Sequence, residues 1–194
     1  MTEDFSPYTE QFYRDHLDLE HKTAMDAIAR ELVARYHPEY VLDWGAGVGN
    51  LIESFRSHGV RAEGYEPYAV FHVLSPILRD SLLAAYHWKD WSPSRKFDLV
   101  TCLEVAEHVP SEEAPALIAS LTGKSDRIFF SSAIPGQGGT GHIHETENYV
   151  WDDLFLNEGF VRNPEASRDV VRGYANEVGT LWWYRNARVY ERSP

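Results

Sequence analysis

The stretch from residue 41 to residue 51 constrains the fold of this chain more strongly than any other. It begins with the apolar pair Val41 and Leu42, which is typical of a buried strand, and continues with glycines at positions 45, 47 and 49. Alternating glycines allow a sharp turn with close backbone approach, and a helix that starts there can bind a ligand at its N-terminus. Because glycines also close strand-to-helix connections that bind nothing, the turn alone leaves a ligand-free interpretation open.

An acidic residue follows this turn at the spacing expected of a nucleoside site. Glu66 comes about 20 residues after Gly45, at the end of a second apolar stretch over 60–66. A carboxylate at the end of a second strand can accept hydrogen bonds from ribose hydroxyls. The turn and the acid together favour a bound ligand.

Strand-like and helix-like patterns alternate along the chain. Apolar runs typical of strands occur at 81–87, 97–102, 127–132 and 160–161. The tail over 181–190 is expected to supply the last strand, with the alternative that 175–184 begin as a helix. Patterns typical of helices occur at 8–18, 20–36, 49–58, 69–79, 112–122 and 146–158. This alternation predicts an α/β fold in which a mostly parallel, seven-stranded sheet is covered by helices on both faces.

The charge balance bears on the class of partner. The chain carries 30 acidic residues against 18 Lys and Arg, for a formal net charge of −12, which repels the phosphate backbone of nucleic acid. No apolar run is long enough to span a membrane, and the acidic N-terminus differs from a signal peptide. The single Cys102 cannot form an internal disulfide. We therefore expect a cytoplasmic protein with no membrane partner and no nucleic acid partner.

The order of motifs over residues 41–132 resembles that of class I S-adenosylmethionine-dependent methyltransferases. The resemblance implies a single Rossmann-like domain over 1–194, in which 1–38 form an N-terminal helical cap, or lid, and 39–194 form the core. It also implies that S-adenosylmethionine is the cofactor, with its methionine part over the glycine turn and its adenine near Asp90 and Trp91. The cofactor-binding residues that it implies are Asp43, Trp44, Gly45, Ala46, Gly47, Gly49, Glu66, Pro67, Asp90, Trp91, Leu103 and Glu104.

Candidate catalytic residues follow the strand over 97–102. Methyl transfer requires alignment of the acceptor and, for a hydroxyl or an amine, a base near neutral pKa, for which His is the default candidate. We expect this base to be one of His108, His142 and His144.

A divalent metal is a further hypothesis. If the pattern Glu104-x-x-Glu107-His108 lies on one helical turn or tight loop, it brings two carboxylates and an imidazole together, and one of His142 or His144 would complete a site for Mg or Mn, or less readily Zn. This cluster resembles those of polyprenyl-quinone O-methyltransferases and small-RNA 3′-terminal methyltransferases, which implies Glu104, Glu107, His108 and His144 as ligands. The alternative is that the cluster only shapes the pocket.

The predicted activity is methylation of a hydroxyl, with an amine second, on a small-molecule acceptor. The loop over 135–145 and the Trp-Trp-Tyr segment 182–184 resemble those of bacterial methyltransferases of glycan and secondary-metabolite pathways, which implies a sugar-containing or polyhydroxylated acceptor. The aromatic residues considered for the lid or the acceptor pocket, with a place in the core as the alternative for each, are Tyr8, Phe12, Tyr13, His16, Trp151, Trp182, Trp183 and Tyr184. The alternatives are metal-assisted methylation of an RNA 3′ end and non-catalytic binding of S-adenosylmethionine.

Overall fold

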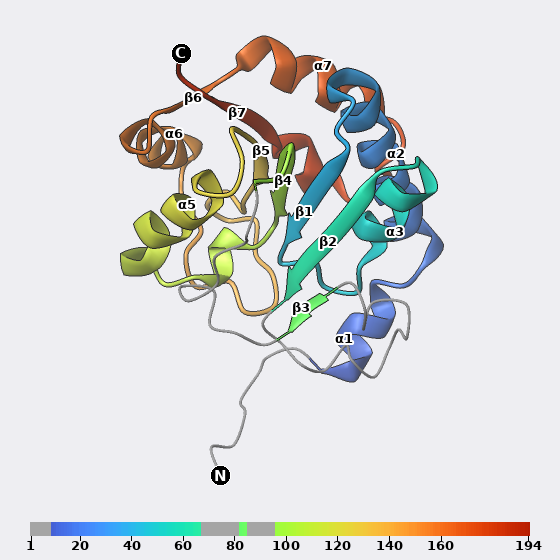
Figure 1. Ribbon diagram of the computed structural model, residues 1–194. Helices are drawn as coiled ribbons and strands as arrows, with labels where there is room; N and C mark the ends of the chain where they lie inside the picture. The colour runs from blue at the N-terminus through green and yellow to red at the C-terminus, as the bar shows by residue number, and fades with distance from the viewer. Residues whose placement is uncertain (1–8, 67–81, 85–95) are drawn as a thin grey trace.

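The computed structural model of the chain describes residues 9–66, 82–84 and 96–194 (Figure 1). Within these residues the strands are β1 Tyr40–Trp44, β2 Arg61–Glu66, β3 Leu82–Ala84, β4 Leu99–Leu103, β5 Arg127–Ser131, β6 Phe160–Arg162 and β7 Arg188–Arg192. They form one sheet of seven strands in the order β3-β2-β1-β4-β5-β7-β6. Pairing is parallel from β3 to β5, and β7 is antiparallel to both of its neighbours. The helix expected over 69–79 lies outside the described residues.

Helices lie on both faces of this sheet, as the alternation of patterns predicted (Figure 1). The α-helices are α1 Glu10–Asp15, α2 Leu19–Tyr36, α3 Asn50–Ser57, α5 Ala114–Thr122, α6 Asn148–Asn157 and α7 Pro164–Tyr174. Three short 3-10 helices are η2 Ala106–His108, η3 Ser111–Glu113 and η4 Trp182–Asn186. Buried side chains of α2, α3 and α7 cover one face, and those of α5 and α6 cover the other.

Strand β5 contributes side chains to the hydrophobic layers on both faces of the sheet. Phe129 packs against the first set of helices and Phe130 against the second, because successive residues of a strand point to opposite faces. In the second layer Phe155 stacks on Tyr190 with ring centroids 3.8 Å apart. Trp151 is completely buried in the same layer, so the interpretation of this residue as a wall of an acceptor pocket is wrong.

The C-terminal third differs from the prediction in two places. Helix α7 was not expected, although Asn163 caps it through a hydrogen bond from Ala166 N and Pro164 occupies its first turn. The Trp-Trp-Tyr segment was expected in the last strand, with a helical start over 175–184 as the alternative; it forms the 3-10 helix η4, and β7 begins only at Arg188. This segment is therefore displaced from the sheet and free to line a cavity.

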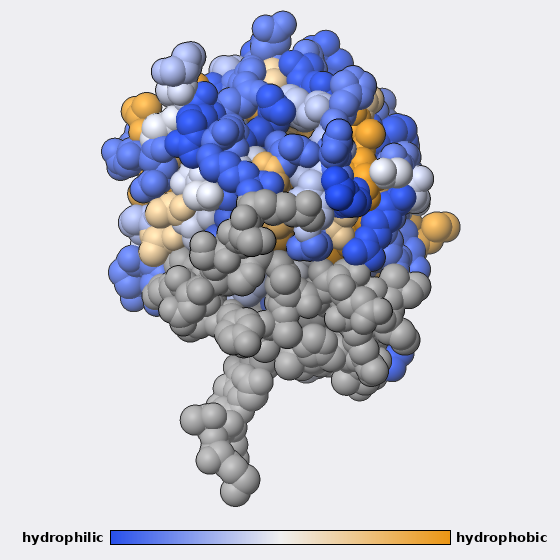
Figure 2. Space-filling view, in the orientation of Figure 1, coloured by the Kyte–Doolittle hydropathy of each residue, from blue (hydrophilic) through white to orange (hydrophobic). Residues whose placement is uncertain are grey.

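The molecular surface offers no extended apolar region on the face that Figure 2 displays. Outside the grey residues this face is mainly hydrophilic, with apolar residues in separate spots. Among the residues that the structure describes, no helix combines the length and the apolar character that crossing a membrane needs.

A buried carboxyl group joins the two central strands. Asp43, near the end of β1, is 5% exposed, and its Oδ1 accepts a hydrogen bond of 2.7 Å from Thr101 Oγ1 on β4. Burial raises the pKa of Asp43 from its ordinary value of 3.8 to about 7, and the Thr101 bond offsets only part of this effect. A carboxyl whose pKa is raised by folding stabilises the fold below its unfolded pKa and loses that contribution as pH rises through the folded value.

We therefore expect Asp43→Asn to stabilise the ligand-free protein at neutral and higher pH. The free energy of unfolding should exceed that of the wild type by about 1–4 kcal/mol at pH 8, and the gain should grow between pH 4 and pH 7 and then level off. Urea unfolding at a series of pH values measures this difference. Asp153→Asn, at an exposed position of α6, is the control and should give a flat difference. A pH-independent effect of Asp43→Asn would contradict the expectation.

Candidate functional site

A cavity of about 390 Å³ opens at the carboxyl ends of β1, β2 and β4. This edge of a parallel sheet is where ligands of open α/β proteins bind. The described residues that line the cavity come from the glycine turn, the ends of β2 and β4, the loop 137–142, the first two helices and η4. Segments from the start, middle and end of the chain thus surround one space.

The glycine turn is held against β2 by its own backbone. Gly45 N and Ala46 N donate to the carbonyl oxygen of Tyr65 at 2.8 and 3.0 Å, and Gly47 N donates to Glu66 Oε2 at 2.8 Å. Gly45 has a φ of +78°, and a Cβ added there would overlap the side chain of Val105. The position therefore excludes other residues on two independent grounds. Glu66 lies directly beside the turn, as its spacing in the sequence suggested.

Most of the predicted cofactor residues lie at this cavity. Trp44 does not: it is 2% exposed, its ring stacks on Tyr65 at 4.5 Å, and it belongs to the core. Gly49 does not line the cavity either, but its φ of +79° starts α3 as the N-cap residue. Pro67, Asp90 and Trp91 lie outside the described residues. The predicted residues that line the cavity are Asp43, Gly45, Ala46, Gly47, Glu66, Leu103 and Glu104.

Glu104 is held in an unusual backbone conformation at the end of β4. Its φ of +55° is uncommon for a residue with a side chain, and such strain often occurs at functional sites. Gln137 Nε2 donates to Oε2 at 2.7 Å, whereas Oε1 is buried and has no hydrogen-bond partner. Burial raises the pKa of this carboxyl. Among the described residues no group donates a hydrogen bond to Glu104 Oε1, and Glu104 lines the cavity, where a ligand can supply a donor.

Glu107 is the most deeply buried acid of the cluster, with no exposed surface. Oε2 accepts a hydrogen bond from Ser132 Oγ at 3.2 Å, and Oε1 has no hydrogen-bond partner. Burial first, and the nearby charge of Glu104 second, raise the pKa of Glu107. The backbone carbonyl oxygen of Glu107 accepts hydrogen bonds from Ile143 N and His144 N, both at 3.0 Å. These two bonds attach η2 to the glycine-rich loop.

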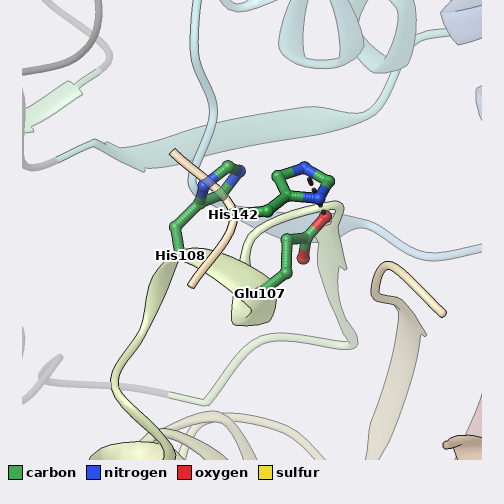
Figure 3. Close-up of side chains that lie close together, drawn as sticks. All are labelled: Glu107, His108 and His142. Atoms are coloured by element: carbon green, nitrogen blue, oxygen red, sulfur yellow. Dashed lines mark ion pairs between the residues drawn. The ribbon is translucent and has the colours of Figure 1, made fainter. Parts of the chain in front are cut away.

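Two histidines face Glu107 (Figure 3). His142 Nε2 lies 3.8 Å from Glu107 Oε1, and the rings of His108 and His142 lie 5.0 Å apart. His108 Nδ1 lies 3.1 Å from the carbonyl oxygen of Gly141, which fixes a proton on that nitrogen. Burial lowers the pKa of His108, and the Gly141 bond opposes the shift. Both rings therefore present an Nε2 edge near the cavity, which both residues line.

The three side chains fit a mixed nitrogen and oxygen cation site. Ligand atoms of Glu107, His108 and His142 all lie within 4.8 Å of one another, and Glu107 Oε1 has no hydrogen-bond partner among the described residues. The ligand set implied by the resemblance contained His144, with His142 as the alternative, and the structure brings His142 to the cluster. His144 does not line the cavity; its ring lies 5.4 Å from Trp151, with Nδ1 buried and without a hydrogen-bond partner.

The other side of the cavity is largely aromatic. Phe12, Tyr13 and His16, which were considered for a lid, line it together with η4. His21, which was not among the candidate residues, also lines it, and its ring lies 4.6 Å from that of His16. Asn50, which was not singled out, lines the cavity with an unpaired, buried Oδ1. Its position directly after the third glycine was the signal that could have identified it.

Comparison with known proteins agrees with this geometry. The model of a methyltransferase domain family matches residues 13–132. A curated relative, the ubiquinone biosynthesis O-methyltransferase of Sodalis glossinidius (strain morsitans), is 34% identical over 105 residues. This alignment covers 47% of the chain and 40% of the relative, so less than half of the relative's length is matched.

Solved structures share the fold. Magnesium protoporphyrin IX methyltransferase from Synechocystis PCC 6803 with bound S-adenosylmethionine superposes with a TM-score of 0.64 at 19% identity, over 96% of this chain and 86% of that one. The S-adenosylmethionine-bound amino pentose methyltransferase CalS10 from Micromonospora echinaspora gives 0.66 at 17% identity, over 96% and 98% of the two chains.

Such identities establish the α/β Rossmann-like architecture alone, whereas the family model covers more than half of the sequence, including the glycine turn and the ends of β2 and β4. The chain belongs to the methyltransferase domain family, as its motif order predicted.

Proposed function

We propose that this chain transfers a methyl group from S-adenosylmethionine to a hydroxyl group of a small molecule, with an amine as the second type of acceptor. The observation that carries the proposal is the continuity of the cavity. One space of about 390 Å³ joins the glycine turn and Glu66 to His108 and His142. Cofactor and acceptor can therefore meet in one cavity, as an in-line displacement requires.

The cofactor half of the cavity is assigned to the glycine turn. Backbone approach at Gly45 and Gly47 leaves room for the methionine part, and Glu66 can accept from the ribose hydroxyls. The unpaired Glu104 Oε1 suits the ammonium of the methionine part. S-adenosylmethionine supplies the electrophilic methyl group. Pro67, Asp90 and Trp91 remain assigned to the cofactor by resemblance.

His142 is the preferred base among the three candidates. It lines the cavity, and Nε2 faces the space between Glu107 and His108, where an acceptor hydroxyl can donate its proton. His108 is the second candidate, because its Nδ1 is committed to Gly141 and its other nitrogen can act as an acceptor. His144, outside the cavity lining, is the weakest of the three.

The acceptor half is assigned to the aromatic side of the cavity. We assign Phe12, Tyr13 and His16 to an N-terminal lid, and these residues line the cavity together with residues of η4. Aromatic rings flanked by acceptor oxygens suit a sugar-containing or otherwise polyhydroxylated molecule. We propose that residues 1–194 form one domain, with 1–38 as the cap. The net charge of −12 disfavours the RNA alternative.

A direct test of the activity uses S-adenosylmethionine with a labelled methyl group. The purified chain is offered amino sugars, neutral sugars, phenols and a short RNA, and labelled product is counted. Transfer to a sugar or phenol supports the proposal. Transfer to the RNA alone, or cofactor binding without transfer to any of the four, favours one of the alternatives.

Glu66→Ala should weaken cofactor binding by about tenfold or more. Loss of a hydrogen bond to a charged group costs about 1.5–3 kcal/mol, and the truncation also releases Gly47 N. Isothermal titration with S-adenosylmethionine measures the affinity. Glu53→Gln, at an exposed position of α3, is the control and should bind like the wild type. If the wild type, Glu66→Ala and Glu53→Gln bound the cofactor with equal affinity, Glu66 would not be a cofactor-binding residue.

His142→Gln should lower kcat by about 100-fold or more with little change in cofactor affinity, because general base catalysis contributes about 10²–10⁴-fold. The matched control is His144→Gln, which changes the neighbouring His of the same loop outside the cavity lining. Initial rates with a saturating acceptor measure kcat, and thermal melting checks folding. If His144→Gln is the more damaging change, the assignment of the base is reversed.

Divalent metal binding is the second candidate property, favoured by the convergence of Glu107, His108 and His142. If the cluster binds a cation, Mn²⁺ should raise the melting temperature, a chelator should reverse the rise, and Glu107→Gln should abolish it. Differential scanning fluorimetry measures these shifts. An unchanged melting temperature in Mn²⁺ and in Mg²⁺ would leave the cluster as part of the pocket without a metal.

A further inference from the structure

The loop that carries His142 is organised around a single carboxylate. Gly136 N donates to Glu145 Oε2 at 2.7 Å, Gly138 N donates to Oε1 at 2.6 Å, and His142 Nδ1 lies 2.9 Å from the same Oε1. Three groups spread over seven residues thus converge on one side chain. Sequence reasoning assigned no role to Glu145.

The loop relies on this carboxylate for two of its backbone N–H groups, in addition to the contacts of Gly141 O with His108 and of Ile143 N with Glu107 O. Gly136, Gly138 and Gly141 all have positive φ angles, of +85°, +69° and +75°. Such a path forms no continuous ladder of backbone hydrogen bonds, and glycine loses much conformational entropy when it is held in place. The two backbone N–H groups at positions 136 and 138 satisfy their hydrogen bonds on Glu145 instead.

The same carboxylate determines the chemical form of His142. An ionised carboxylate only accepts hydrogen bonds, so the nitrogen that faces it must carry the proton. Gly136 N and Gly138 N donate to the two oxygens of Glu145, so this side chain acts as an acceptor toward the loop. With the proton on Nδ1, the Nε2 of neutral His142 carries a lone pair directed toward Glu107 and the cavity.

The ring is also confined from the side. A Cβ added to Gly139 would overlap Nε2, Cε1 and Cδ2 of His142, so the ring packs directly on the backbone of this glycine. Gly139 does not have a positive φ, and an alanine there meets no backbone strain. Substitution at position 139 therefore displaces the ring while the Glu145 side chain remains.

We propose that Glu145 is a positioning residue, which fixes the Nδ1–H tautomer of His142 and holds the loop 136–142 so that Nε2 faces the acceptor. Glu145 does not line the cavity, so it acts through His142 rather than on the substrate. The expected effect of Glu145 on the rate rests on the proposed function. The tautomer of His142 can be measured whether or not the protein methylates an acceptor.

Glu145→Gln tests the inference, because the amide keeps the size of the side chain but can donate a hydrogen bond to Nδ1. Imidazole ¹⁵N spectra of neutral His142 should change from one Nδ1–H tautomer to a mixture, or to the Nε2–H form. The value of kcat should fall about 10- to 100-fold, with the affinity for S-adenosylmethionine unchanged. Glu145→Asp, which keeps the ionised acceptor, should retain the Nδ1–H tautomer and recover part of the rate.

Two further variants separate positioning from a structural role. Glu147→Gln, at an exposed position two residues on, should match the wild type in every measurement. Gly139→Ala should lower kcat while the Nδ1–H tautomer persists, because it moves the ring without removing its partner. An unchanged tautomer in Glu145→Gln would overturn the inference. The inference would also be overturned if Glu145→Gln lowered the rate, the cofactor affinity and the melting temperature together, since that result indicates that Glu145 only stabilises the fold of the loop.

The spectra also separate failure of this inference from failure of the proposed function. If the wild type methylates no acceptor, the proposed function fails, but the tautomer of His142 in the wild type and in Glu145→Gln is still measured. A wild type that methylates acceptors with His142 in the Nε2–H form would refute the positioning role and leave the activity intact.

Discussion

The carbonyl oxygen of Tyr65 accepts two hydrogen bonds from the glycine turn, and the whole cavity depends on this contact. Gly45 N and Ala46 N both reach it, which fixes the exit of β1 beside the end of β2. The next amide, that of Gly47, then meets the Glu66 carboxylate. Without the hydrogen bonds to the Tyr65 carbonyl, the glycine turn and Glu66 would not line one surface, and the start of α3 would not be fixed beside β2.

Buried acids give the site its chemical character. Asp43, Glu104 and Glu107 all have pKa values raised by burial, and no Lys or Arg lines the described part of the cavity. Carboxyl groups that are held away from water without cationic partners destabilise the empty protein. A ligand that donates hydrogen bonds, or that carries positive charge, relieves this cost when it binds. A sulfonium cofactor with an ammonium group has both properties.

Local signals in the sequence predicted the sheet, the turn and Glu66, because each depends on a short pattern or a fixed spacing. Trp44 was misplaced because a strand alternates its faces, and the residue beside a ligand turn can point into the core. The Trp-Trp-Tyr segment has the composition of a strand, yet tertiary packing places it in η4. The choice between His142 and His144 depends on the path of a loop rich in left-handed glycines, and that path is set by Glu145. No pattern in the sequence displays such a contact.

Two segments that lie far apart in the sequence are joined beside the cavity. Glu20 Oε1, in the first turn of α2, accepts from Thr180 N at 2.6 Å and from Thr180 Oγ1 at 2.7 Å, and Arg30 pairs with Glu177 at 2.6 Å. His21, which follows Glu20, and Trp182, two residues after Thr180, both line the cavity. The two lining segments are therefore held together by polar contacts near the surface as well as by core packing. Substitutions at residues 20 and 180 change these contacts directly, whereas the glycine turn and the histidines of the cavity are held by other hydrogen bonds.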